Sequence, residues 1–215
     1  MVAKTFLLTL SGTHGTGKST SAGRCYYILS GFGLKLSFLR HQDILDPFGF
    51  LVRRAARILG LMEHELDGMK PVRFLWAMYI LFIYCPIVTG GILLRQFLGY
   101  SVICDRYIYD LLVGFRDNGK TVPLEEIVIR LVPRPDLSFV LDAPEERILL
   151  ERPEHSSEFI RKEKLLYETV AEHFRLRLLS TDAPAQTVWQ RMFAEIESMM
   201  LSRQLQRGLQ GAEIS

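Results

Sequence analysis

The chain has 215 residues, and its 26 lysines and arginines against 24 aspartates and glutamates give a formal net charge of +2 at pH 7. This length suits a single α/β domain with a large core. The near balance of charge gives no reason to expect a nucleic-acid partner. The three cysteines, Cys25, Cys85 and Cys104, lack metal-ligand spacing, which predicts buried thiols, a reducing cytoplasm and no zinc site. We also expect no signal peptide.

The first predicted strand, Thr5–Leu10, leads into a phosphate-binding motif. Residues 12–19 match G-x-x-x-x-G-K-S, and a helix is predicted directly afterwards, over Lys18–Leu29. In this context, backbone amides at a helix N-terminus wrap a triphosphate. Lys18 would reach the β- and γ-phosphates, and the Ser19 hydroxyl would take one position on Mg²⁺. The predicted nucleotide-binding residues are Gly12, Thr13, His14, Gly15, Thr16, Gly17, Lys18, Ser19 and Thr20.

A second strand is predicted over Leu34–Leu39 and ends at Arg40. An amphipathic helix is predicted next, over Leu51–Met62. Parallel strands deliver the residues that follow them to one edge of a sheet, where ligands bind. Arg40 is therefore a candidate for a ligand contact, and the alternative is a solvated charge at a strand end.

The helical region Pro71–Leu98 contains an uncharged stretch, Phe74–Leu94, that is long enough to span a membrane. Pro86 and the pair Gly90-Gly91 predict a helix that breaks near Pro86 and restarts after Thr89. A helix that is apolar on all sides can also be enclosed in a protein or at a subunit interface. We favour the enclosed or dimer-forming interpretation, and membrane contact stays open as the alternative.

A short buried strand, Ser101–Cys104, delivers Asp105 and Arg106 to its carboxyl end. These two residues are therefore candidates for ligand or metal binding, and an internal salt bridge between them is the alternative.

The last third of the chain continues the alternation of strands and helices. A strand is predicted over Leu137–Leu141, and a charged helical lid follows at about 145–165. The last strand is predicted over Leu176–Leu179, and the last helix over Thr187–Leu201. We expect residues 202–215 to form a flexible tail and residues 1–201 to form one domain. This order is typical of a parallel sheet with helices on both faces.

Three features together resemble the thymidylate kinase branch of the nucleoside monophosphate kinases. They are the phosphate loop, the sequence Asp105-Arg106-Tyr107 after a buried strand, and the late turn Ser180–Pro184. The stretch Leu141–Glu146 also resembles the family's exit from a strand into the lid helix. The resemblance covers most of the chain. It implies an α/β P-loop three-layer fold with a five-stranded parallel sheet, ATP as donor, Mg²⁺, dTMP as acceptor and a homodimer built on long helices.

Phosphoryl transfer requires two anions held in line by fixed cations. The resemblance assigns the acceptor phosphate to Arg40 and Arg106, and it assigns Mg²⁺ to Asp105, which could instead orient the arginine. The predicted catalytic residues are Lys18, Asp105, Arg106 and Arg152, with Arg147 and Arg161 as alternatives for the lid arginine. The donor base would lie between Arg147 or Arg152 and the turn that contains Thr181 and Asp182. Tyr107, next to Arg106, completes the predicted acceptor side.

The chain departs from the family pattern at two places on the acceptor side. His14 stands where thymidylate kinases often have an acidic residue that contacts the acceptor sugar. The family's aromatic residue followed by Asn-Arg is replaced by Trp76, Tyr79 and Ile80. Trp76 could be a stacking platform or a core residue. Three functions therefore stay open: a nucleoside monophosphate kinase, a related kinase with a more apolar phosphorylated acceptor, or a non-catalytic ATP-binding module.

Overall fold

The structure is a computed structural model that describes residues 5–40, 50–55, 57–58, 60, 69–117 and 125–212. Its strands are β1 (Leu7–Gly12), β2 (Leu36–Arg40), β3 (Ser101–Asp105), β4 (Leu137–Asp142) and β5 (Arg177–Ser180). They form one five-stranded sheet in the order β2-β3-β1-β4-β5, and all neighbouring strands are parallel. The predicted α/β class and the five strands are confirmed, with strand ends within two residues of those expected.

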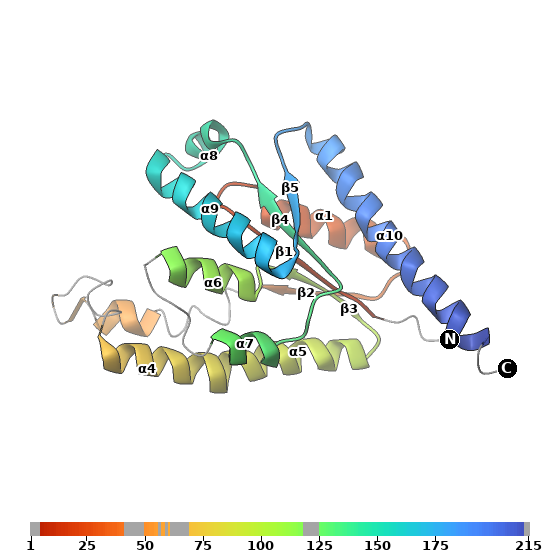
Figure 1. Ribbon diagram of the computed structural model, residues 1–215, viewed down its shortest axis with the longest axis horizontal. Helices are drawn as coiled ribbons and strands as arrows, with labels where there is room; N and C mark the ends of the chain where they lie inside the picture. Colours follow the sequence, from red (N-terminus) through yellow and green to blue (C-terminus); the bar gives the residue numbers. More distant parts are fainter. Residues whose placement is uncertain are drawn as a thin grey trace.

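Helices cover both faces of the sheet, which gives three layers (Figure 1). On one face, α1 (Lys18–Gly31) and α10 (Ala185–Ala212) pack against Leu8, Leu10 and Phe139. The opposite face is covered by α5 (Cys85–Phe97), α6 (Ile108–Asp117), α7 (Glu125–Leu131) and α9 (Ser157–Phe174). The central strand β1 is buried along its whole length, as its apolar sequence predicts.

The apolar helical region does not break at Pro86, so this part of the prediction is wrong. Helix α4 (Lys70–Tyr79) continues through a π-helical segment, η1 (Ile80–Tyr84), directly into α5. Pro86 lies in the first turn of α5, where its missing N–H is tolerated. The wider π-helical turn that precedes it adjusts the backbone hydrogen bonds, so the helix continues through Thr89 and the glycine pair.

Two further helices differ from the predicted bounds or extend beyond the described residues. Within the predicted helix 51–62, residues 51–55 and 57–58 are helical and residue 60 lies in a turn, whereas residues 56, 59, 61 and 62 lie outside the described residues. Helix α10 continues past its predicted end at Leu201 to Ala212. Its extension is anchored by Arg203, which donates to the carbonyl of Thr5 at 3.0 Å and also pairs with Asp136.

The three cysteines are buried and free. Burial raises the pKa of Cys25 and of Cys104 to about 12. All three thiols are therefore core side chains, as their spacing predicts.

Candidate functional site

The carboxyl ends of the strands bring distant parts of the chain to one edge of the sheet. The phosphate loop follows β1, Arg40 ends β2, and Asp105 ends β3. Asp105 is the register partner of Leu10 in β1 and of Arg40 in β2. This edge is where ligands bind in open α/β sheets.

Glycines shape the phosphate loop at the points where a side chain could not fit. Gly12 has φ 140°, and a Cβ there would lie 2.1 Å from the carbonyl oxygen of Leu141 in β4. Gly15 and Gly17 also have positive φ, 75° and 79°. The loop ends at Gly17, so the first backbone amides of α1 face the inside of the loop.

The side chain of Lys18 is buried against the phosphate loop, residues 12–17. Its Nζ donates to the carbonyl oxygens of Gly12 and Thr13, at 2.7 and 2.5 Å. Burial lowers the pKa of Lys18 to about 8, and the negative charge of Asp110 partly offsets this effect. The amine can therefore gain or lose a proton in response to a charge placed in the loop.

Asp105, the predicted Mg²⁺ ligand, is a buried carboxylate at the end of β3. Its side chain is 3% exposed, and its Oδ2 lies 4.0 Å from Nε of Arg40. Among the described residues, its Oδ1 is a buried oxygen with no hydrogen-bond partner. A buried carboxylate oxygen that lacks a partner is costly, and a hydrated Mg²⁺ would satisfy it. Ser19, the other predicted ligand, is exposed at the start of α1.

Arg106 has an unusual backbone conformation. Its φ is 68°, in the left-handed region that arginine rarely adopts, and its N–H donates to the carbonyl of Leu10 at 2.9 Å. Its guanidinium Nη1 lies 3.9 Å from Oδ1 of Asp110. The observed ion pair of Arg106 is therefore with Asp110, whereas Asp105 lies near Arg40.

Sequence reasoning missed Asp110, which joins three parts of the site. Its Oδ2 accepts from Oγ of Ser11 at 2.6 Å and from the N–H of Tyr107 at 3.0 Å. Its Oδ1 accepts from the hydroxyl of Tyr167 at 2.8 Å. Burial, together with Asp110, raises the pKa of Tyr167 well above its ordinary value, so this hydroxyl stays a donor. Asp110 lies in the first turn of α6, four residues after Arg106. This position is the sequence signal that could have indicated Asp110 as a site residue.

Glu163 is the second residue that sequence reasoning missed. Its Oε1 lies 2.7 Å from Nδ1 of His14, and its Oε2 accepts from the His14 N–H at 3.3 Å. Glu163 is buried within α9, and its position in the apolar series Ile160, Glu163, Tyr167 is the signal that could have revealed it. The ring of His155 lies 5.4 Å from that of His14.

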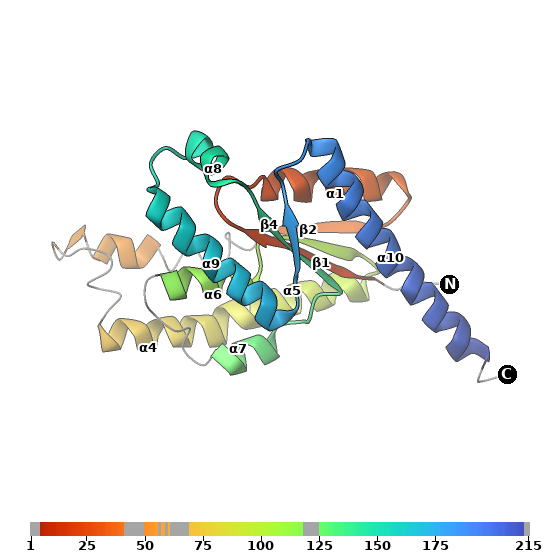
Figure 2. The same cartoon turned by 45° about the horizontal axis from the view of Figure 1, so that its top comes forward.

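The predicted lid lies against the phosphate loop. It comprises α8 (Glu145–Glu151) and the start of α9, and Figure 2 shows α8 next to the N-terminal end of α1. A Cβ on Gly15 would lie 3.5 Å from Oε2 of Glu151 and 3.7 Å from Cγ of Arg152. The guanidinium of Arg152 is half exposed and lies 3.5 Å from Glu154.

The other two candidate lid arginines, Arg147 and Arg161, contact different parts of the chain. Nη1 of Arg147 donates to the carbonyl of Thr181 at 2.7 Å, which brings α8 to the turn predicted to bind the donor base. Thr181 itself donates from its hydroxyl to the carbonyl of Asp142 at 2.9 Å, and the N–H of Asp182 donates to Ser180 at 3.3 Å. Arg161 pairs with Glu145 at 2.7 Å and is largely exposed.

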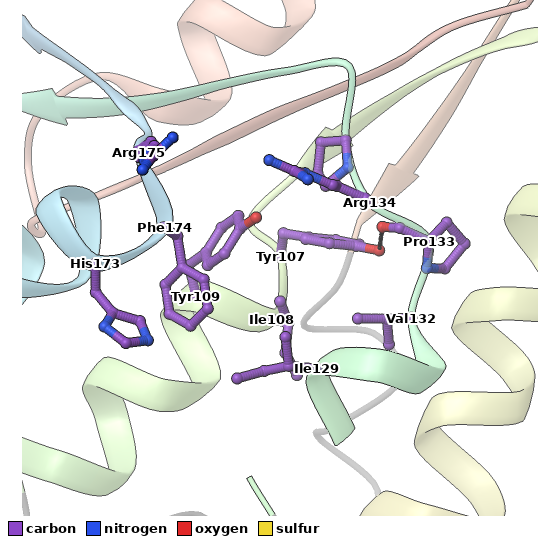
Figure 3. Close-up of a pocket in the computed structure, with 11 residues that line it drawn as sticks. Tyr107, Ile108, Tyr109, Ile129, Val132, Pro133, Arg134, His173, Phe174 and Arg175 are labelled. Atoms are coloured by element: carbon purple, nitrogen blue, oxygen red, sulfur yellow. Dashed lines mark hydrogen bonds between the residues drawn. The ribbon is translucent and has the colours of Figure 1, made fainter. Parts of the chain in front are cut away.

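The side chain of Tyr107, predicted on the acceptor side, is a buried core side chain. Its hydroxyl donates to the carbonyl of Pro133 at 2.6 Å, and burial raises its pKa well above the ordinary value. Tyr107 lines a pocket of about 330 Å³. Figure 3 shows it there together with Tyr109, Arg134 and Phe174. The side chain therefore belongs to the layer between α6, α7 and α9.

Trp76 lies on α4, partly buried, in edge-on contact with two aromatic rings. Its ring centroid is 6.3 Å from that of Tyr79 and 5.7 Å from that of Phe115. This packing supports the core interpretation of Trp76.

No family model matches the chain, and no curated protein sequence matches it. The fold and the geometry at the edge of the sheet are therefore the observations that bear on function.

Proposed function

We propose that the chain is an ATP-dependent phosphotransferase that moves the γ-phosphoryl group of ATP to a nucleoside monophosphate, with dTMP as the first candidate. One observation carries the proposal: the glycine-shaped loop with its buried Lys18 shares an edge of the sheet with Arg40, Asp105 and Arg106. The loop suits the donor phosphates, and the two guanidinium groups suit a second anion.

In the proposed reaction, a phosphate oxygen of the acceptor forms a bond to the γ-phosphorus of ATP. The bond between this phosphorus and the bridging oxygen breaks, and ADP leaves with the electron pair. Lys18 and the loop amides hold the β- and γ-phosphates, and Arg40 and Arg106 offset repulsion between the two anions. Arg152 or Arg147 would bring a further positive charge from the lid.

Mg²⁺ fits the donor set at this edge. Asp105 would hold the ion, directly or through water, because its buried Oδ1 has no other partner among the described residues. The Ser19 hydroxyl would supply a second ligand. When bound, the ion would neutralise charge that develops on the phosphate oxygens.

A second candidate function is a related kinase with a more apolar phosphorylated acceptor. It is favoured by Tyr79 and Ile80, which stand where the resembling family has Asn-Arg. The third, a non-catalytic ATP-binding module, is disfavoured because a nucleotide switch does not need arginines for a second anion.

Release of ADP from ATP, measured with a panel of monophosphates, separates these candidates. Stimulation by dTMP or dUMP supports the proposed reaction. Stimulation by other phosphorylated compounds alone supports the second candidate. ATP binding without stimulation by any acceptor would leave only the ATP-binding module.

A further inference from the structure

Helices α4 and α5 and the segment η1 carry an apolar face that no other described residue covers. We define the apolar face by Phe74, Phe82, Ile83, Leu93, Leu94 and Phe97. Each of these side chains is at least 44% exposed, and Phe97 is 88% exposed. Proteins that stay monomeric in water rarely expose apolar surface of this extent, so the face indicates an interaction surface.

The opposite side of the same helix is packed on the sheet, so a partner can contact the helix only on its apolar face. Ile80, Tyr84, Val88 and Ile92 are at most 1% exposed and belong to the core on that face of the sheet. By length and composition, the helix Lys70–Phe97 could cross a membrane. It cannot do so while it stays packed on the sheet, because these four residues would have to leave the core. Within this fold the helix can lie on a surface but cannot span a bilayer.

The charged residues of the helix that carries the apolar face are all basic. Residues 69–104 contain no aspartate or glutamate, and Lys70 and Arg73 lie at the start of α4. At the same end of the molecule, the helical residues 50–55 and 57–58 carry three more arginines, Arg53, Arg54 and Arg57 (Figures 1 and 2). This stretch also exposes Phe50 and Ile58. A basic helix with an exposed apolar side is typical of helices that bind anionic lipid surfaces.

We infer that the apolar face docks the protein onto an anionic lipid bilayer surface. The apolar side chains enter the boundary between head groups and acyl chains, and the flanking cations contact lipid phosphates. A second copy of the chain fits less well. In a two-fold interface the same face meets itself, and residues 69–104, which carry the face, contain no carboxylate that could pair with Lys70 or Arg73 of the other copy.

Flotation of the full chain with lipid vesicles tests this inference. One set of vesicles contains phosphatidylcholine alone, and the other contains added phosphatidylglycerol. We expect the bound fraction to be at least about tenfold greater on the anionic vesicles, and the difference to shrink in high salt. In Lys70→Glu combined with Arg73→Glu, the preference for anionic vesicles should fall.

The variant Phe82→Ser with Phe97→Ser should release the protein from both kinds of vesicle. Phe32→Ser is its matched control, because Phe32 is 72% exposed but lies at the C-terminal end of α1, away from the apolar face. Thermal melting checks that all variants fold. Absence of vesicle binding, or equal binding by wild type and the Phe82/Phe97 variant, would overturn the inference. Ultracentrifugation showing a dimer that only this variant dissociates, without vesicle binding, would assign the face to a second copy.

Discussion

The imidazole of His14 in the phosphate loop is paired with the buried carboxylate of Glu163 in α9, with 2.7 Å between Nδ1 and Oε1. The same carboxylate accepts from the His14 N–H. One side chain of α9, within the predicted lid, therefore fixes both the ring and the backbone of the loop. This contact ties the conformation of the phosphate loop to the position of α9.

We expect Glu163→Ala to lower kcat/KM for ATP roughly tenfold or more, because a hydrogen bond to a charged group contributes about 1.5–3 kcal/mol. Glu163→Gln, which can still accept a hydrogen bond, should recover part of this loss. Glu168→Ala is the control, since Glu168 is exposed on the same helix. Unchanged kinetics in Glu163→Ala, with the fold intact, would show that the pair does not position the loop.

Lys18 should take up a proton when ATP binds. Burial lowers its pKa to about 8 in the free protein, and the triphosphate should raise it again. The affinity for ATP should therefore decrease as the pH rises through about 8. Calorimetry in buffers of different ionisation enthalpy measures the uptake. In Lys18→Arg the uptake should vanish, because a guanidinium stays charged; equal uptake in both proteins would refute this role.

The buried amine of Lys18 should lower the free energy of unfolding of the protein without ATP. Its folded pKa lies below its ordinary value of 10.5, so between about pH 8 and 10.5 the unfolded chain binds more protons and stability rises with pH. Lys18→Met should stabilise the free protein at pH 7 by on the order of 2 kcal/mol, with the lost hydrogen bonds included. The gain should shrink towards pH 10. Urea unfolding measures it, and a less stable variant at pH 7 would contradict the expectation.

Asp105→Asn should raise the Mg²⁺ concentration needed for half-maximal activity and lower kcat by about a hundredfold or more. The exchange keeps the shape of the side chain but removes the charge opposite Arg40. Circular dichroism checks the fold. A Mg²⁺ dependence identical to that of wild type would exclude Asp105 from the metal site.

Arg106→Ala should weaken the acceptor far more than ATP, by about tenfold to a hundredfold in KM, because a charge-assisted contact to phosphate is lost. Arg40→Ala should act in the same direction. Steady-state kinetics with each substrate varied in turn gives both values. If the KM values for ATP and acceptor rose equally, the two anion sites would have been misplaced.

The sequence predicts the parts of the molecule whose signal is local. The apolar runs predict all five strands, and parallel strands necessarily bring Arg40 and Asp105 to one edge. It does not predict contacts made by helices that are distant along the chain. Asp110 and Glu163 look like ordinary helix-surface charges until the fold buries them against Ser11 and His14.

The local sequence also does not predict that the helix continues through Pro86. Proline ends most helices, and only the π-helical segment that precedes it allows this one to continue. The contact of the Tyr107 hydroxyl with the carbonyl of Pro133 and the positive φ of Arg106 likewise depend on the fold and not on the local sequence.

The proposed phosphotransferase binds two anions at one edge of the sheet, and crystals grown with Mg-ADP and inorganic phosphate would show both. We predict density for the β-phosphate inside the loop of residues 12–17, next to Lys18, and a separate phosphate between Arg40 and Arg106. A loop without nucleotide, or arginines that bind no anion under these conditions, would contradict the proposed phosphotransferase.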